Sequence, residues 1–169
     1  LVAFFAAPQC ATCHPAEAKA HALTRHASAM MPVSESAFAR NLPPQPLHES
    51  QHGYSFLFRP VKNGIEMMSI EGDRHAEGII EWVMGSGEQG QTPLVRAGSE
   101  TLESRVSYFP ALRQYGVTMG QRPGASPDPQ SALGLPQSRN DVKNCLNCHA
   151  TGITADLQPV VTGVQCQRC

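Results

Sequence analysis

The sequence predicts an α+β fold that is rich in loops, with short helices at cysteine motifs and a small antiparallel sheet inserted between them. Three observations support this prediction. All six cysteines fall in Cys-x-x-Cys pairs, which begin at positions 10, 145 and 166. Between the first and second pairs lie short apolar runs of the kind that form β-strands. Glycine and proline number 14 each while aromatic residues make up only 6%, which favours many turns and few large core side chains.

The first two cysteine pairs are each followed at once by a histidine. They read Cys10-Ala11-Thr12-Cys13-His14 and Cys145-Leu146-Asn147-Cys148-His149. This spacing is the attachment signature of c-type haem. Two thiols on one helical turn can form thioethers with the two vinyl groups, and the next imidazole can bind the iron. We therefore expect each motif to attach one haem, with His14 and His149 as the proximal ligands.

The third pair, Cys166-Gln167-Arg168-Cys169, stands at the end of the sequence where its histidine would come next. We expect Cys166 and Cys169 to attach a third haem, and we expect the natural polypeptide to continue past a truncated C-terminus. A disulfide between these two cysteines is an alternative, although its short loop would strain the bond. A zinc site shared with Cys145 and Cys148 is the other alternative.

A helix is predicted directly after the first motif. Pro15 stands at the favoured first helical position, residues 16–31 are rich in alanine, and Pro32 would end the helix. We expect Met30 and Met31, at the end of this helix, to be packing residues.

Each haem needs a second axial ligand, and the chain has seven histidines. On a continuous helix His26 would lie about 18 Å beyond His14 along the axis, so we expect it to bind a neighbouring haem. His52 is the other expected distal ligand, because it adjoins the next ordered segment. His21 and His48 are further candidates.

A small sheet is predicted between the first and second motifs. Residues 54–58 and 65–70 read as strands, and Lys62-Asn63-Gly64 between them favours a tight hairpin. Residues 79–84 could form a third strand or a short helix, and residues 102–109 read as another strand.

Connecting segments surround this sheet. Residues 41–51 contain three prolines and predict an extended connector, and residues 121–140 predict an ordered loop or linker. His75 follows a charged stretch and is expected to be exposed. Helical structure should return at residues 142–149.

We expect one domain over residues 1–169, with the first motif and helix in 1–40, the sheet in 52–110 and the later motifs in 141–169. Because large apolar side chains are few, the porphyrins should supply much of the core, and we expect a haem-cored fold.

Charge and hydropathy limit the partners and the location. The formal net charge is −1 with no basic block, which argues against nucleic acid as a partner. No segment is long enough to span a membrane. Haem attachment to Cys-x-x-Cys-His takes place outside the cytoplasm, so we expect a periplasmic or extracellular protein. We expect the sequence to begin at or after a signal-processing site, with the apolar residues 1–7 packed on a haem.

Three segments carry a family resemblance: residues 82–91 (Trp-Val-Met-Gly-Ser-Gly-Glu-Gln-Gly-Gln), residues 106–110 (Val-Ser-Tyr-Phe-Pro) and residues 144–149 (Asn-Cys-Leu-Asn-Cys-His). With them, the chain resembles the exported multihaem c-type cytochromes of environmental bacteria, some of which carry fused tetratricopeptide repeats. The resemblance implies a histidine-bearing segment, here residues 24–27, before the sheet. It also implies a Gly-Val segment, here at Gly163, before the last motif. The histidines and the Gly-Pro segment that follow the family's third motif are absent from this sequence.

We therefore expect electron transfer through two to three covalently bound haem c groups with mostly bis-histidine ligation, and we expect a carrier and not an enzyme. Expected partners are other redox proteins, further haem chains, or copies of this chain in a homo-oligomer or filament. The alternative function is a multihaem reductase of a small oxyanion, of the nitrite or tetrathionate type, with one open haem site. A structural zinc protein is a third possibility.

Overall fold

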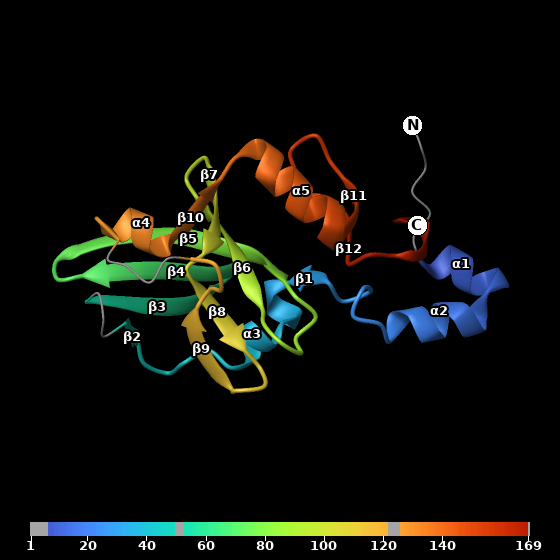
Figure 1. Ribbon diagram of the computed structural model, residues 1–169, viewed down its shortest axis with the longest axis horizontal. Helices are drawn as coiled ribbons and strands as arrows, with labels where there is room; N and C mark the ends of the chain where they lie inside the picture. The colour runs from blue at the N-terminus through green and yellow to red at the C-terminus, as the bar shows by residue number, and fades with distance from the viewer. Residues whose placement is uncertain (1–6, 50–52, 122–125, 169) are drawn as a thin grey trace. The chain divides into compact units, whose positions relative to one another are not determined.

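The structure, a computed structural model, describes residues 7–49, 53–121 and 126–168 (Figure 1). It divides into two compact units. Residues 1–31 and 139–169 form the first, here called the cysteine unit because the sequence places all six cysteines in it. Residues 32–138 form the second, here called the sheet unit. The chain therefore leaves the cysteine unit after the first motif and returns to it just before the second.

The cysteine unit is built from short elements. In chain order these are α1 (Ala7–Cys13), α2 (Pro15–Ala22), α5 (Arg139–His149), β11 (Ala150–Ile153), β12 (Pro159–Thr162) and the 3-10 turn η2 (Cys166–Arg168). Strand β1 (Met30–Pro32) crosses the boundary between the units. The helix expected at 142–149 is confirmed as α5, and Pro15 does begin α2.

The long helix expected over residues 16–31 is wrong, because α2 ends at Ala22. The hydroxyl of Thr24 donates to the His21 carbonyl at 2.7 Å and accepts from the Ala27 N–H at 3.2 Å. Such side-chain bonds offer the backbone an alternative to helix continuation. The 18 Å spacing of His26 from His14 assumed a continuous helix, so that argument no longer applies. Met30 is 1% exposed, which confirms it as a packing residue.

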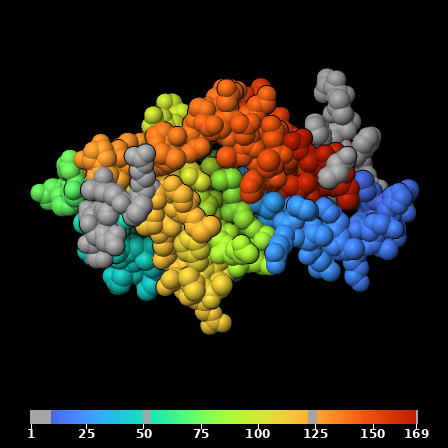
Figure 2. Space-filling model, in the orientation of Figure 1, coloured from blue at the N-terminus to red at the C-terminus, as the bar shows by residue number. Residues whose placement is uncertain are grey.

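The sheet unit contains most of the strands. They are β2 (Leu47–Glu49), β3 (Tyr54–Val61), β4 (Gly64–Glu71), β5 (Arg74–Met84), β6 (Thr92–Ala97), β7 (Glu100–Ser104), β8 (Val106–Phe109), β9 (Gln114–Val117) and β10 (Gly134–Gln137). Its helices are η1 (Val33–Glu35), α3 (Ala37–Arg40) and α4 (Pro129–Leu133). The main sheet runs β10-β7-β6-β5-β4-β3-β2 with antiparallel neighbours, and β8 and β9 form a separate hairpin on the face shown in Figure 2.

The hairpin expected around Asn63-Gly64 is confirmed, since Val61 pairs with Gly64 and Ser55 with Ile70. The third run is a strand and forms part of β5. The single strand expected at 102–109 is instead two strands that belong to different sheets. The Ser104 hydroxyl donates to the Val106 carbonyl and accepts from its N–H, which turns the chain away from the main sheet.

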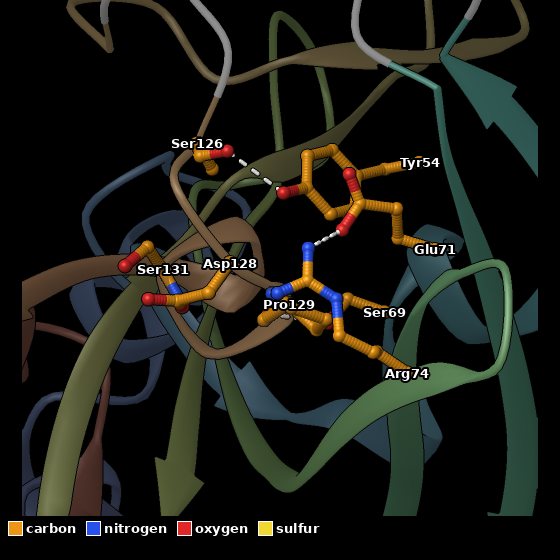
Figure 3. A network of polar contacts seen from close by, with 8 residues as sticks. All are labelled: Tyr54, Ser69, Glu71, Arg74, Ser126, Asp128, Pro129 and Ser131. Atoms are coloured by element: carbon orange, nitrogen blue, oxygen red, sulfur yellow. Dashed lines mark hydrogen bonds and ion pairs between the residues drawn. The ribbon is translucent and has the colours of Figure 1, made fainter.

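The loop expected over residues 121–140 is wrong in its second half, which contains α4, β10 and the start of α5. Figure 3 shows how this segment is held on the main sheet. The Asp128 carboxylate accepts from the Ser131 N–H at 2.8 Å and caps α4, while the Ser69 hydroxyl donates to the Pro129 carbonyl. Tyr54 donates to the Ser126 carbonyl at 2.7 Å. Side chains at long sequence separation therefore order a segment that its composition alone marks as a linker.

The sheet unit has a side-chain core of its own. Phe38, Phe58, Tyr108 and Tyr115 form an aromatic cluster, with edge-on contact between Phe38 and Phe58 at 5.4 Å between ring centroids. Burial raises the pKa of the Tyr115 hydroxyl, which donates to the Phe38 carbonyl. The haem-cored fold expected for residues 1–169 stays a prediction, whereas the sheet unit packs around side chains of its own.

A nearly buried ion pair lies in the same unit. The Arg105 guanidinium donates to both carboxylate oxygens of Glu49, at 3.0 and 2.8 Å, and the two side chains are only 6% and 14% exposed. Because both side chains are largely removed from water, each charge needs the opposite charge beside it, and the two hydrogen bonds supply that compensation.

Candidate functional site

The second motif lies on the last two turns of α5. Val142 and Leu146, four residues apart, are buried on one face of this helix. That orientation leaves Cys145 half-buried and Cys148 exposed on the neighbouring face. Because residues three apart share a helix face, both thiols are placed to react with one planar group.

His149 ends α5, and its ring is held by the backbone. Its Nδ1 lies 2.9 Å from the carbonyl oxygen of Ala29. A carbonyl can only accept, so Nδ1 carries the proton and donates. The lone pair is then on Nε2, which is the arrangement of a metal-binding imidazole supported by an outer hydrogen bond.

The first motif is arranged in a similar way. Cys10 and Cys13 stand three apart in α1, with Cys10 half-buried and Cys13 exposed. His14 is exposed at the junction where α1 gives way to α2. Its N–H donates to the Cys10 carbonyl at 2.8 Å, which keeps the histidine in register with the helical turn of the thiols.

A hairpin brings the chain back from the second motif to the third. Strands β11 and β12 pair in antiparallel fashion, and the Thr151 hydroxyl then binds the segment that follows. It donates to the Gly163 carbonyl at 3.0 Å and accepts from the Gln165 N–H at 2.7 Å. This places Cys166, which is exposed, at the start of η2.

The third motif contacts both of the others through the two residues between its cysteines. The Gln167 amide nitrogen lies 3.8 Å from the Cys10 sulfur. The Arg168 guanidinium donates to the carbonyl of Asn147, at 2.7 and 3.1 Å, and Asn147 lies between the two cysteines of the second motif. Motifs that are far apart in sequence are therefore gathered in one place.

The loop after α2 connects to the same region. The His26 carbonyl accepts from the Val164 N–H at 2.8 Å, and the Ala29 carbonyl is the one that holds His149. The His26 side chain itself is exposed. The main chain of residues 26–29 therefore makes hydrogen bonds both to His149 of the second motif and to the segment just before the third.

His21 differs from His149 in which ring nitrogen is engaged. Its Nε2 lies 2.8 Å from the Val164 carbonyl, so Nε2 carries the proton and the lone pair is on Nδ1. The side chain joins α2 to the segment before the third motif. This geometry favours a bracing role over iron ligation through Nε2.

The remaining candidates lie elsewhere. His48, on β2, and His75, on β5, are exposed in the sheet unit, and Nδ1 of His48 is 3.2 Å from the Ser55 hydroxyl. His52 and Cys169 lie outside the described residues. Sequence reasoning did not single out Ala29, Thr151, Gly163, Gln167 or Arg168 for these contacts. The position of Gln167 and Arg168 inside a Cys-x-x-Cys pair, and that of Gly163 in the segment before it, are the signals that could have suggested these three.

The donor set fits covalent haem better than zinc. Within residues 7–49, 53–121 and 126–168, no three histidine, cysteine or acidic side chains come together as a metal site. The shared zinc site would need Cys145, Cys148 and Cys166 around one ion, and they do not form such a group. Instead, the first two pairs each present their thiols on a helical turn, as attachment to a separate ring requires.

The cysteine unit also carries a positive formal charge by sequence. Five basic residues against three acidic ones leave +2: Lys19, Arg25, Arg139, Lys143 and Arg168, against Glu17, Asp141 and Asp156. Haem propionates are negative, so these cations would offset part of the charge that the cofactors bring.

Comparison with known proteins agrees with this chemistry. The family described as cytochrome c554 and c-prime matches residues 123–169, which include the second and third motifs. The match supports a protein of the c-type cytochrome kind, with haem c as cofactor and electron transfer as its function. No curated protein and no solved structure matches the chain. None of the helices in the described part of the chain is both long and apolar enough to cross a membrane.

Proposed function

We propose that this chain is a multihaem electron-transfer protein that carries two to three haem c groups in the cysteine unit. The observation that carries the proposal is the convergence of the motifs: Gln167 of the third contacts Cys10 of the first, and Arg168 contacts Asn147 of the second. Haems attached at motifs in contact are close enough for electrons to pass between them.

The residues have distinct roles in this proposal. The thiols of the first two motifs hold one haem each, at Cys10 and Cys13 and at Cys145 and Cys148, and Cys166 with Cys169 hold the third. His14 and His149 bind iron as the proximal ligands. When bound, each haem supplies an iron that accepts and releases one electron.

Ala29 tunes the second of these sites. Its carbonyl accepts a hydrogen bond from Nδ1–H of His149. This bond makes Nε2 a stronger electron-pair donor to iron and so favours the oxidised state. His26 is the proposed distal ligand of a neighbouring haem, and it is exposed on the loop after α2. His52 remains a second proposed distal ligand.

The setting of the protein follows from the attachment chemistry. We propose export to the periplasm or the cell exterior, and kinship with the multihaem cytochromes related to tetratricopeptide-fused forms. Proposed partners are other redox proteins, further haem chains or copies of this chain in a homo-oligomer or filament.

The test begins with the protein produced in a host that attaches haem c outside the cytoplasm. We expect a Soret band, an intact mass that corresponds to two or three covalent haems, and low-spin spectra in both oxidation states from the irons bound by His14 and His149. A matched control replaces both cysteines of the second motif, Cys145→Ala and Cys148→Ala, and should lose one haem.

Two outcomes would overturn the proposal. A protein with zinc and no Soret band would exclude haem. A high-spin iron that binds carbon monoxide at the first or second motif of the unmodified protein would favour the alternative reductase, because that enzyme needs an open axial site.

A further inference from the structure

Arg168 occupies an unusual position, because it lies inside one cysteine pair and binds the interior of another. Its guanidinium donates to the Asn147 carbonyl from Nε at 3.1 Å and from a terminal nitrogen at 2.7 Å. The same terminal nitrogen lies 3.3 Å from the Asn147 side-chain oxygen. Two-pronged contacts of this kind fix orientation as well as distance, since the guanidinium is planar and rigid.

The contact joins the end of α5 to the 3-10 turn of the third motif. Asn147 is on the last turn of α5, between Cys145 and Cys148, and Arg168 closes the 3-10 turn that begins at Cys166. A carbonyl this close to the end of a helix has no N–H partner further along the helix and is a ready acceptor. Arg168 therefore supplies a bond that the helix end lacks and ties η2, which begins at Cys166, to the second cysteine pair.

We propose that Arg168 is a positioning residue that sets the mutual orientation of the second and third haems, and thereby their electronic coupling. The inference rests on the proposed function, because it requires both pairs to carry haem. Arg168 binds the protein backbone and is not an iron ligand. Its positive charge has a second effect, since a cation near haems that carry negative propionates would favour the reduced irons.

Four substitutions separate alignment from charge. Arg168→Ala removes both. Arg168→Lys keeps the charge but replaces the planar guanidinium with a single donor nitrogen. Asn147→Ala leaves the backbone carbonyl, and with it two of the three contacts. Lys143→Gln removes one exposed positive charge from the same helix without touching the contact.

The measurement is electron paramagnetic resonance of the fully oxidised holoprotein, together with intact mass and a redox titration. We expect Arg168→Ala to keep all its haems but lose the coupled signal of one haem pair, which separates into two independent low-spin signals. Arg168→Lys should restore part of the coupling, and Asn147→Ala should retain it. Lys143→Gln should lower the potentials while leaving the coupling unchanged.

The outcomes are distinguishable. If the unmodified protein lacks a haem at Cys166, its mass shows that the proposed third site has failed, and the inference fails with it. If the third haem is present and Arg168→Ala keeps the coupled signal, the inference alone is overturned. Should Arg168→Ala fail to retain the third haem, Arg168→Lys decides the matter: coupling between its haems equal to that of the unmodified protein would overturn the positioning role, and reduced coupling would support it.

Discussion

Replacement of Gly163 by alanine tests the contact on which the third motif depends. Gly163 has a φ of +74° and lies directly before the segment that leads to Cys166. A Cβ there would overlap the carbonyl of Ala27, a main-chain group. That carbonyl cannot move away easily, because hydrogen bonds hold the main chain on both sides of it. The His26 carbonyl accepts from the Val164 N–H, and the Ala29 carbonyl accepts from Nδ1 of His149.

The size of the effect follows from a matched glycine. Gly72 has a φ of +56° with no atom near its Cβ position, so Gly72→Ala should cost only the left-handed conformation, about 1–2 kcal/mol. Gly163→Ala adds a backbone overlap, and we expect about 3–4 kcal/mol in total. With a urea dependence of about 2 kcal/mol per molar, the midpoint should fall by about 1.5–2 M, against about 0.5–1 M for Gly72→Ala.

The assay is urea unfolding of the holoprotein followed by two probes. The Soret band reports on the cysteine unit, and fluorescence of the single tryptophan, Trp82 on β5, reports on the sheet unit. Gly163→Ala should shift the Soret transition and Gly72→Ala the fluorescence transition. Equal costs for the two substitutions would refute the reasoning, because the overlap with Ala27 would then contribute nothing.

Three further predictions concern ligation, the buried ion pair and acid stability. His26→Ala should convert one iron from low to high spin and introduce carbon monoxide binding at unchanged haem mass, and an unaltered spectrum would contradict the assignment. Arg105→Ala should destabilise the sheet unit by about 3–5 kcal/mol in urea unfolding, because the Glu49 carboxylate loses its main cation, whereas the double change Arg105→Met, Glu49→Leu should cost much less. Hydrogen bonds from the Ser131 N–H and hydroxyl hold the pKa of Asp128 below its ordinary value, so the stabilisation exists at neutral pH and is lost as the pH falls below about 4. Asp128→Asn should weaken this acid dependence of the thermal midpoint, and an identical pH profile would argue against it.

The features that depend on a few adjacent residues could be predicted from the sequence. The Cys-x-x-Cys-His motifs are recognisable because attachment of haem c needs two thiols and an imidazole within five consecutive residues. The hairpin at Asn63-Gly64 and the start of α2 at Pro15 are confirmed for the same reason, since a turn or a helix start depends on a few adjacent residues.

Contacts between distant segments decided the rest. The ordering of residues 126–137 depends on hydrogen bonds from Tyr54 and Ser69, which a pattern of hydrophobicity does not encode. The same holds for the site. The sequence places Ala29 and His149 120 positions apart, and Gln167 and Cys10 157 apart, yet each pair is in contact. Which ring nitrogen of His149 is available is a property of the folded chain, because it depends on a backbone carbonyl of the kind that every residue carries. Which motifs meet is equally a property of the folded chain, because Gln167 and Arg168 reach partners that are distant in sequence.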